Sequence, residues 1–291
     1  MRIWKKWAAM STTRQVFRVK LLSPQGTAYN LSGPDNARIV VLIHGLGLTR
    51  QTWAGHVPSL AQYFRVLTYD LCGHGESALP TRIPSLTVLS DQLRDLMEHL
   101  HLPSAALIGF SLGGMINRRF AMDHPDRVSA LVILNSPHER SPEAQRIVEE
   151  RAAQSGAGAA ATINTTLDRW FTPSFRAKHP GEVASVRASV LANDPNNFAL
   201  HRQVLAHGVL ELIRPQPPIT HPTLVMTCEN DSGSTPDMSL AIASENPNAQ
   251  VRIIPALQHL GLVEQPDLFT TPIHDFLGQV LARNNENRKA S

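Results

Sequence analysis

Gly109-Phe110-Ser111-Leu112-Gly113 is the stretch that decides the fold of this chain. It lies between an apolar run, Ala105 to Ile108, and a helical pattern that extends from Leu112 to Asp123. A strand, one sharply turned residue and a helix, in that order, make up a nucleophile elbow, and the glycines leave room for its tight turn. We therefore expect Ser111 at the carboxyl end of a strand, beside the positive amino end of the helix. The alternative is an ordinary tight turn that contains a serine, and the flanking patterns favour the elbow.

Apolar runs alternate with helical patterns on both sides of this stretch. Continuous apolar runs such as Ile39–Ile43 are typical of strands that are buried on both faces. Alternation of strand and helix predicts an α/β fold with a mostly parallel central sheet and helices on both faces. The expected strands are 15–22, 27–31, 39–43, 64–69, 105–108, 128–134, 223–227 and 251–254, and the expected helices of this part are 86–100, 112–123 and 267–281.

The pattern becomes purely helical between residues 137 and 215. Helices are expected there at about 142–154, 159–171, 182–192 and 196–212, without a convincing strand. Such an insertion at the carboxyl edge of a sheet typically covers the site and shapes its pocket. We therefore expect an N-terminal extension at 1–14, a core formed by 15–136 and 216–291, and a helical cap at 137–215.

Composition excludes several classes of protein. The 291 residues are 42% hydrophobic and 18% charged, enough for one large α/β domain. The formal net charge is only +3, and no Lys/Arg run indicates a nucleic-acid partner. No apolar stretch is long enough to span a bilayer, and the first residues do not form a secretory signal. Cys72 and Cys228 have no metal or redox spacing and suit a reducing compartment, so we expect a cytoplasmic protein.

A serine nucleophile needs a base within hydrogen-bond reach, and histidine is the natural choice near neutral pH. Of the thirteen histidines, His259 lies in a loop, 256–261, that follows the last expected strand. A loop at the carboxyl end of a strand is where a base can meet Ser111. The other histidines considered have different explanations. His44 ends a strand, where it organises the backbone, His74 is a turn residue and His274 is a surface residue of the last helix.

The base in turn needs an acid that fixes its tautomer and stabilises its cation. Asp231 follows the 223–227 strand, and the order Ser111, Asp231, His259 is the chain order of an α/β-hydrolase triad. The rival carboxylates are Glu229, Asp237 and Glu139. Two backbone N–H groups are expected to hold the oxyanion: that of Leu112, directly after the nucleophile, and that of Leu46, in the loop after 39–43.

These motifs resemble those of the α/β-hydrolase family over about residues 15–283. They are His44–Gly47, Asp70–Ser77, Gly109–Gly114, the Asp231 loop, and His259 with Glu264 and Pro266. Two segments, Gly109–Met115 and Leu167–Pro173, are similar to those of 3-oxoadipate enol-lactonases and related carboxylesterases. This resemblance implies hydrolysis of an ester or lactone without a cofactor or a metal.

We therefore expect a serine hydrolase that cleaves a small or short-chain carboxylic ester or lactone through an acyl-enzyme. Trp170, Phe171 and Leu167 are candidates for the pocket wall, or are buried between cap helices. Arg118 and Arg119 lie in the helix after Ser111, where they attract an acidic substrate or form a solvated face. The alternatives are a carbon–carbon bond hydrolase of a ring-cleavage product and a non-catalytic ligand receptor. The oligomeric state stays open.

Overall fold

A computed structural model describes residues 21–154, 156 and 159–290 of the chain. The expected N-terminal extension, 1–14, lies outside the described residues. So do residues 15–20 of the first expected strand, whose remaining part, Leu21–Leu22, forms strand β1.

The strands form one eight-stranded sheet with the order β1-β2-β4-β3-β5-β6-β7-β8. Strands β3 to β8 pair with one another in parallel, whereas β1 pairs with β2, and β2 with β4, in antiparallel fashion. The predicted mostly parallel sheet is thereby confirmed. The chain runs from β3 to β4 on one side and then crosses to β5 on the other side, which creates a switch point between β3 and β5. The other strand bounds are β2 (Ala28–Ser32), β3 (Ile39–Ile43), β4 (Arg65–Tyr69), β5 (Ala105–Phe110), β6 (Val128–Leu134), β7 (Thr223–Cys228) and β8 (Ala249–Ile254).

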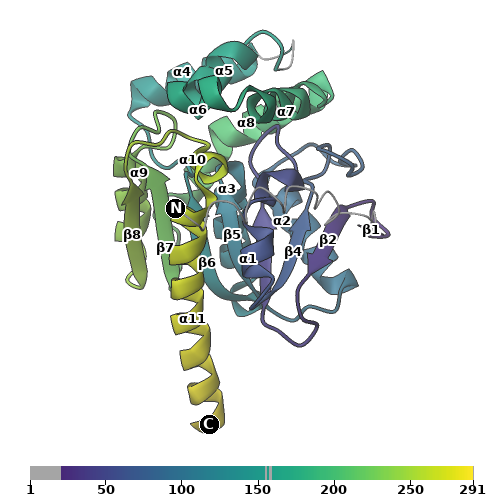
Figure 1. The fold of residues 1–291 in the computed structure, drawn as a ribbon, viewed down its shortest axis with the longest axis vertical. Helices are drawn as coiled ribbons and strands as arrows, with labels where there is room; N and C mark the ends of the chain where they lie inside the picture. Colours follow the sequence, from purple (N-terminus) through teal and green to yellow (C-terminus); the bar gives the residue numbers. More distant parts are fainter. Residues whose placement is uncertain (1–20, 155, 157–158, 291) are drawn as a thin grey trace, which may run out of the picture.

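Helices cover both faces of the sheet (Figure 1). Alternate residues of one strand enter different clusters: Val40 and Leu42 pack with α1 and α11, whereas Val41 and Ile43 pack with α2 and α3. This double burial explains why β3 is apolar at every position. The helices around the sheet are α1 (Val57–Leu60), α2 (Leu86–His99), α3 (Leu112–Asp123), α9 (Pro236–Ser244), α10 (Gly261–Glu264) and α11 (Pro266–Ala290), with the 3₁₀ helices η1 (Arg50–Trp53), η2 (Pro125–Arg127) and η4 (Gly208–Leu212).

The cap helices lie between β6 and β7 in the chain and form a separate layer above the sheet (Figure 1). They are α4 (Pro142–Ala153), α5 (Ile163–Trp170), α6 (Pro173–Lys178), α7 (Pro180–Leu191) and α8 (Pro195–His207). Three of them begin with an oxygen-bearing cap residue followed by proline, which satisfies free N–H groups and presets the first helical φ. The cap residues are Ser141, Thr172 and Asp194.

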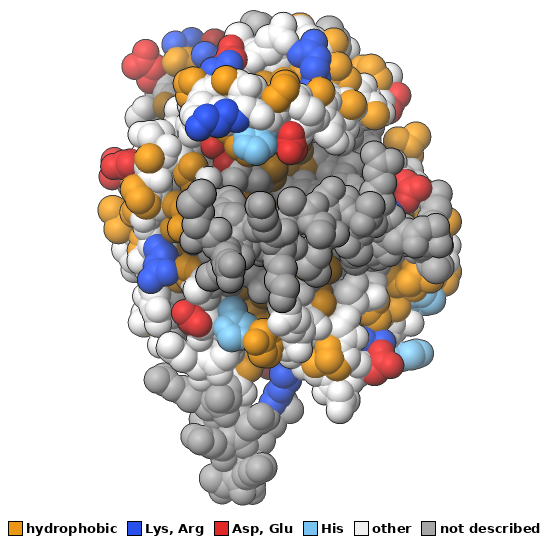
Figure 2. Space-filling model, in the orientation of Figure 1, with side chains coloured by type: hydrophobic (Ala, Val, Ile, Leu, Met, Phe, Trp, Pro, Cys, Tyr) orange, Lys and Arg blue, Asp and Glu red, His pale blue; other side chains and the backbone are white. Residues whose placement is uncertain are grey.

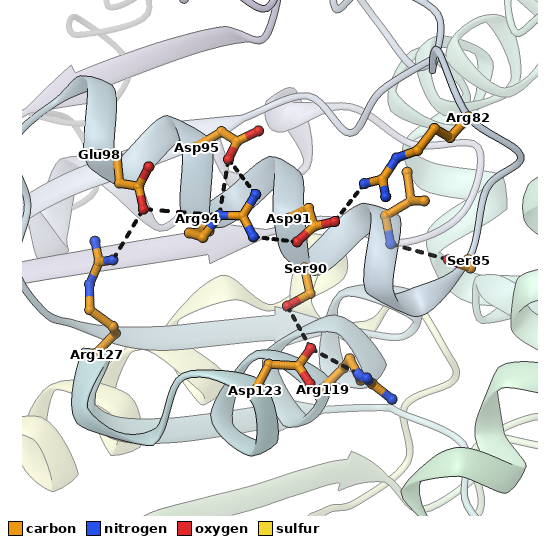
Figure 3. Close-up of polar contacts among 11 residues, drawn as sticks. Arg82, Ser85, Ser90, Asp91, Arg94, Asp95, Glu98, Arg119, Asp123 and Arg127 are labelled. Atoms are coloured by element: carbon orange, nitrogen blue, oxygen red, sulfur yellow. Dashed lines mark hydrogen bonds and ion pairs between the residues drawn. The ribbon is translucent and has the colours of Figure 1, made fainter.

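The polar face of α2 carries a network of surface ion pairs (Figure 3). Arg94 bridges Asp91 and Asp95 on α2, and Arg119 on α3 pairs with Asp123 at 2.9 Å. Arg119 therefore lies on a solvated helix face, one of the two explanations considered for it. Exposed pairs of this kind contribute at most about 1 kcal/mol each.

Charged side chains of both signs are scattered among hydrophobic ones over the described part of the face in Figure 2. No helix among the described residues has the length and apolar character that a membrane crossing requires.

Candidate active site

Ser111 forms the turn between β5 and α3, with φ 55° and ψ −114°. Positive φ is rare and strained for serine, so the surrounding structure must hold this conformation. A Cβ atom at Gly109 would lie 2.1 Å from the Gly113 carbonyl oxygen, and one at Gly113 would lie 2.2 Å from that of Ile43. The two glycines are therefore required because backbone segments approach each other closely around the serine.

Asp231 and His259 lie in the loops that follow β7 and β8. His259 Nδ1 is 2.6 Å from Asp231 Oδ2, and Asp231 Oδ1 accepts hydrogen bonds from the N–H groups of Gly233 and Ser234 at 2.9 and 3.0 Å. Burial by itself raises the pKa of Asp231, but the charge of His259 and the hydrogen bonds outweigh it, and the net shift is downward. The carboxylate is therefore ionised and holds the imidazole by Nδ1, which leaves Nε2 as the free ring nitrogen.

Asn135 is a further member of this site that the sequence reasoning missed. It follows β6 directly, is fully buried with φ 45°, and its Nδ2 donates to Asp231 Oδ2 at 2.8 Å. The same carboxylate oxygen thus accepts hydrogen bonds from both Asn135 and His259. The sequence feature that could have identified Asn135 is its position as a polar residue directly after a buried strand. Neighbouring strands β5 to β8 supply the four side chains in turn.

Ser111 and His259 line one cavity of about 150 Å³ between the sheet and the cap. The His259 ring lies 4.9 Å from that of Phe110 and 6.0 Å from that of Trp170, measured between centroids. In the described part of the chain, the Ser111 hydroxyl and His259 Nε2 are not hydrogen-bonded to each other. Such contacts often tighten only when substrate is bound.

The rival residues have other contacts. His44 donates from Nδ1 to the Gly45 carbonyl at 2.8 Å and accepts at Nε2 from the Leu71 N–H at 3.0 Å, so it joins two loops. Burial lowers the pKa of His44, which fits this neutral role. Glu139 is exposed and pairs with Arg214 at 2.7 Å.

The two expected oxyanion donors lie next to the nucleophile. Leu112 is the first residue of α3, and a Cβ atom at Gly45, beside Leu46, would lie 3.1 Å from Ser111 Cβ. Neither the Leu46 nor the Leu112 N–H donates to another described residue. Two free donors close to one serine are the arrangement that an oxyanion requires.

The three expected wall residues differ in position. Trp170 lines the cavity. Leu167 and Phe171 do not line it and are buried in the hydrophobic cluster shared by cap and core, where Phe171 stacks on Phe175 at 5.2 Å. Both therefore follow the alternative of burial between cap helices.

Arg118 is buried and does not line the cavity. Its guanidinium donates to the carbonyls of Gly114 and Pro137 at 2.9 and 2.7 Å, so it braces the loop after β6. Burial lowers the pKa of Arg118 to about 9.

Among residues 21–154, 156 and 159–290, no group of three His, Cys, Asp or Glu side chains is placed to hold a metal ion.

Comparison with known proteins agrees with this architecture. The 3-oxoadipate enol-lactonase 2 of Acinetobacter baylyi is 26% identical over 264 residues, which cover 87% of this chain and 95% of that protein. The (E)-2-((N-methylformamido)methylene)succinate hydrolase of the same species is 26% identical over 230 residues, covering 78% and 86%. The crystal structure of the enol-lactonase from Burkholderia xenovorans LB400 is 29% identical, with a TM-score of 0.77, and the match covers 87% of this chain and 96% of that one.

A family model described as the alpha/beta hydrolase fold matches residues 38–266, which is more than half of the chain. The resemblance drawn from the motifs is thereby confirmed. The chain belongs to the α/β-hydrolase fold family.

Proposed function

We propose that this protein is a serine hydrolase that cleaves carboxylic esters or lactones through an acyl-enzyme. One observation carries the proposal: Ser111 is held at positive φ in a cavity that it shares with His259, whose Nδ1 is bonded to Asp231 at 2.6 Å. A strained serine beside an oriented imidazole is the arrangement of an activated nucleophile.

In this mechanism Ser111 Oγ attacks the substrate carbonyl carbon while His259 Nε2 takes the hydroxyl proton. The N–H groups of Leu46 and Leu112 stabilise the oxyanion, and Asp231 stabilises the imidazolium. The ester carbon–oxygen bond then breaks, and His259 returns the proton to the leaving alcohol. Water, deprotonated by His259, attacks the acyl-enzyme. The bond between the acyl carbon and Ser111 Oγ then breaks, the acid is released, and His259 returns the proton to Ser111 Oγ. In a lactone the alcohol and the acid belong to one product.

The cavity supports a compact substrate. Its volume of about 150 Å³ is small, and cap residues such as Trp170 and Phe198 line it together with Ser111. A cavity of this size limits the length of the acyl chain that it can accept.

A hydrolysis screen over short alkyl esters, aryl esters and lactones tests the proposal, with Ser111→Ala as the blank. Labelling with a fluorophosphonate should add one mass increment to the wild type and none to Ser111→Ala. Turnover of a vinylogous diketone without any ester turnover would replace the proposal by the carbon–carbon hydrolase alternative. Absence of both turnover and labelling would favour a ligand receptor.

A further inference from the structure

Three arginines line the cavity that contains Ser111. Arg140 lies in the loop before α4, Arg169 on α5 and Arg202 on α8. They come from three parts of the cap, and none was singled out by the sequence reasoning. The same lining contains one carboxylate, Asp231, which is already bonded to His259 and Asn135. The cavity thus has an excess of positive charge on its cap side.

None of the three arginines forms an ion pair within the described residues. Arg140 Nη1 donates to the neutral Gln145 at 3.0 Å. Two carboxylates of the cap have other partners: Glu149 accepts from Gln145 and faces His207, and Asp168 pairs with Arg176. Glu149 does attract Arg140 electrostatically, but it is not within ion-pair distance. The guanidinium donors in the cavity are therefore available to a ligand.

The arrangement is unfavourable for the protein alone. Burial lowers the pKa of Arg202, and repulsion from Arg169 and Arg151 lowers it further. Burial also lowers the pKa of Arg140, which Glu149 only partly offsets. Arg169 is exposed, whereas Arg140 and Arg202 are partly buried, and partly buried charges without counter-ions disfavour the folded state. Such a cluster at a pocket is more easily explained by binding than by stability.

We propose that Arg140, Arg169 and Arg202 form an anion-binding subsite, and that the substrate is an ester or lactone that carries a carboxylate on its far end. This inference rests on the proposed function, because the subsite belongs to the same cavity. Guanidinium groups bind carboxylates through paired, charge-assisted hydrogen bonds. Binding the remote carboxylate orients the ester carbonyl toward Ser111 and neutralises the cluster.

The first test compares monoethyl succinate with ethyl succinamate, two esters of nearly equal size that differ in a carboxylate and a neutral amide. The corresponding glutarate pair allows for a longer span. We expect the wild type to prefer the carboxylate of at least one pair by about tenfold to hundredfold in kcat/KM. Arg202→Gln and Arg140→Gln should lose most of that preference while they still cleave the ester bond of ethyl succinamate. Arg202→Lys, which keeps the charge but not the planar fork, should retain part of it.

Arg187→Gln is the matched control. Arg187 also lies in the cap, on α7, but bonds Asn164 and does not line the cavity, so its removal should leave the preference unchanged. Thermal unfolding separates function from structure. Because Arg202 is repelled in the free protein, Arg202→Gln should have an unchanged or higher Tm, whereas loss of a structural residue would lower it.

A binding measurement keeps the inference distinct from the proposed function. Calorimetric titration of Ser111→Ala with succinate should give binding that succinamide does not give and that Arg140→Gln and Arg202→Gln weaken. If Ser111→Ala binds succinate in this way but the wild type hydrolyses no ester, the subsite is supported and the proposed esterase activity is refuted. Ester turnover with equal kcat/KM for carboxylate and amide, or a preference that survives in the Arg140→Gln/Arg202→Gln double variant, would overturn the subsite. Failure of succinate to bind would do the same.

Discussion

Replacing Asp231 by asparagine changes one acceptor oxygen into a donor at the centre of the site. In the wild type, Oδ1 accepts from the Gly233 and Ser234 N–H groups, and Oδ2 accepts from His259 Nδ1 and Asn135 Nδ2. The asparagine oxygen will stay with the two backbone donors, because an NH₂ group there would face both. Its NH₂ group therefore points at His259 and Asn135.

This orientation inverts the histidine tautomer. His259 must present Nδ1 as an acceptor and carry its proton on Nε2, and a protonated Nε2 no longer accepts the proton of Ser111. We expect kcat to fall by as much as ~10⁴, which corresponds to about 5.5 kcal/mol of transition-state stabilisation. The fold should persist, because the two backbone hydrogen bonds remain. Their charge assistance is lost, at a cost of roughly 1–3 kcal/mol.

The assay is kcat and kcat/KM on the best ester of the hydrolysis screen, with thermal unfolding as the check on folding. Glu139→Gln is the control, since Glu139 is an exposed partner of Arg214 and the variant should retain nearly full activity. A folded Asp231→Asn protein with more than about a tenth of wild-type kcat would refute the tautomer argument. A severe loss in Glu139→Gln would move the acid role to Glu139.

Four further outcomes follow from the same contacts. Ser111→Ala and His259→Ala should each abolish turnover, and the double variant should be no slower than either, because the two residues act as one unit; a large additional loss would show independent action. Glu264→Gln should lower Tm and kcat together, because Glu264 holds the N–H and hydroxyl of Thr172 at 2.7 Å and so ties the cap to the His259 loop; unchanged kinetics would show that the tie is dispensable. Across an acyl-chain series of aryl esters, kcat/KM should decline toward long chains, and a steady rise would refute the size limit set by the cavity. The free energy of unfolding should fall below neutral pH, because burial lowers the pKa of His56 from 6.5 to about 4 and the unfolded state therefore takes up its proton first. Urea unfolding between pH 7 and 4 should show up to ~1.4 kcal/mol lost per pH unit from this residue, and His56→Gln should reduce that slope.

The sequence alone was sufficient to predict those helices and strands that are determined by residues near each other in the chain. The 112–123 helix and the 39–43 and 128–134 strands have the predicted bounds, because apolar periodicity and flanking turn residues determine them. Two helices that periodicity did not predict, α6 and α9, each begin with a Thr-Pro pair, at Thr172 and Thr235. That cap signal was present in the sequence and is itself local.

The order of Ser111, Asp231 and His259 along the chain was also enough to propose the triad, because parallel strands bring their carboxyl ends to one edge of the sheet. Only the tertiary structure placed Asn135 on the Asp231 carboxylate, since that contact joins strand ends 96 residues apart. The same holds for the cavity. Arg140, Arg169 and Arg202 meet because three cap segments fold over the sheet, and no periodicity within one segment reports which of its side chains will face a pocket that other segments complete.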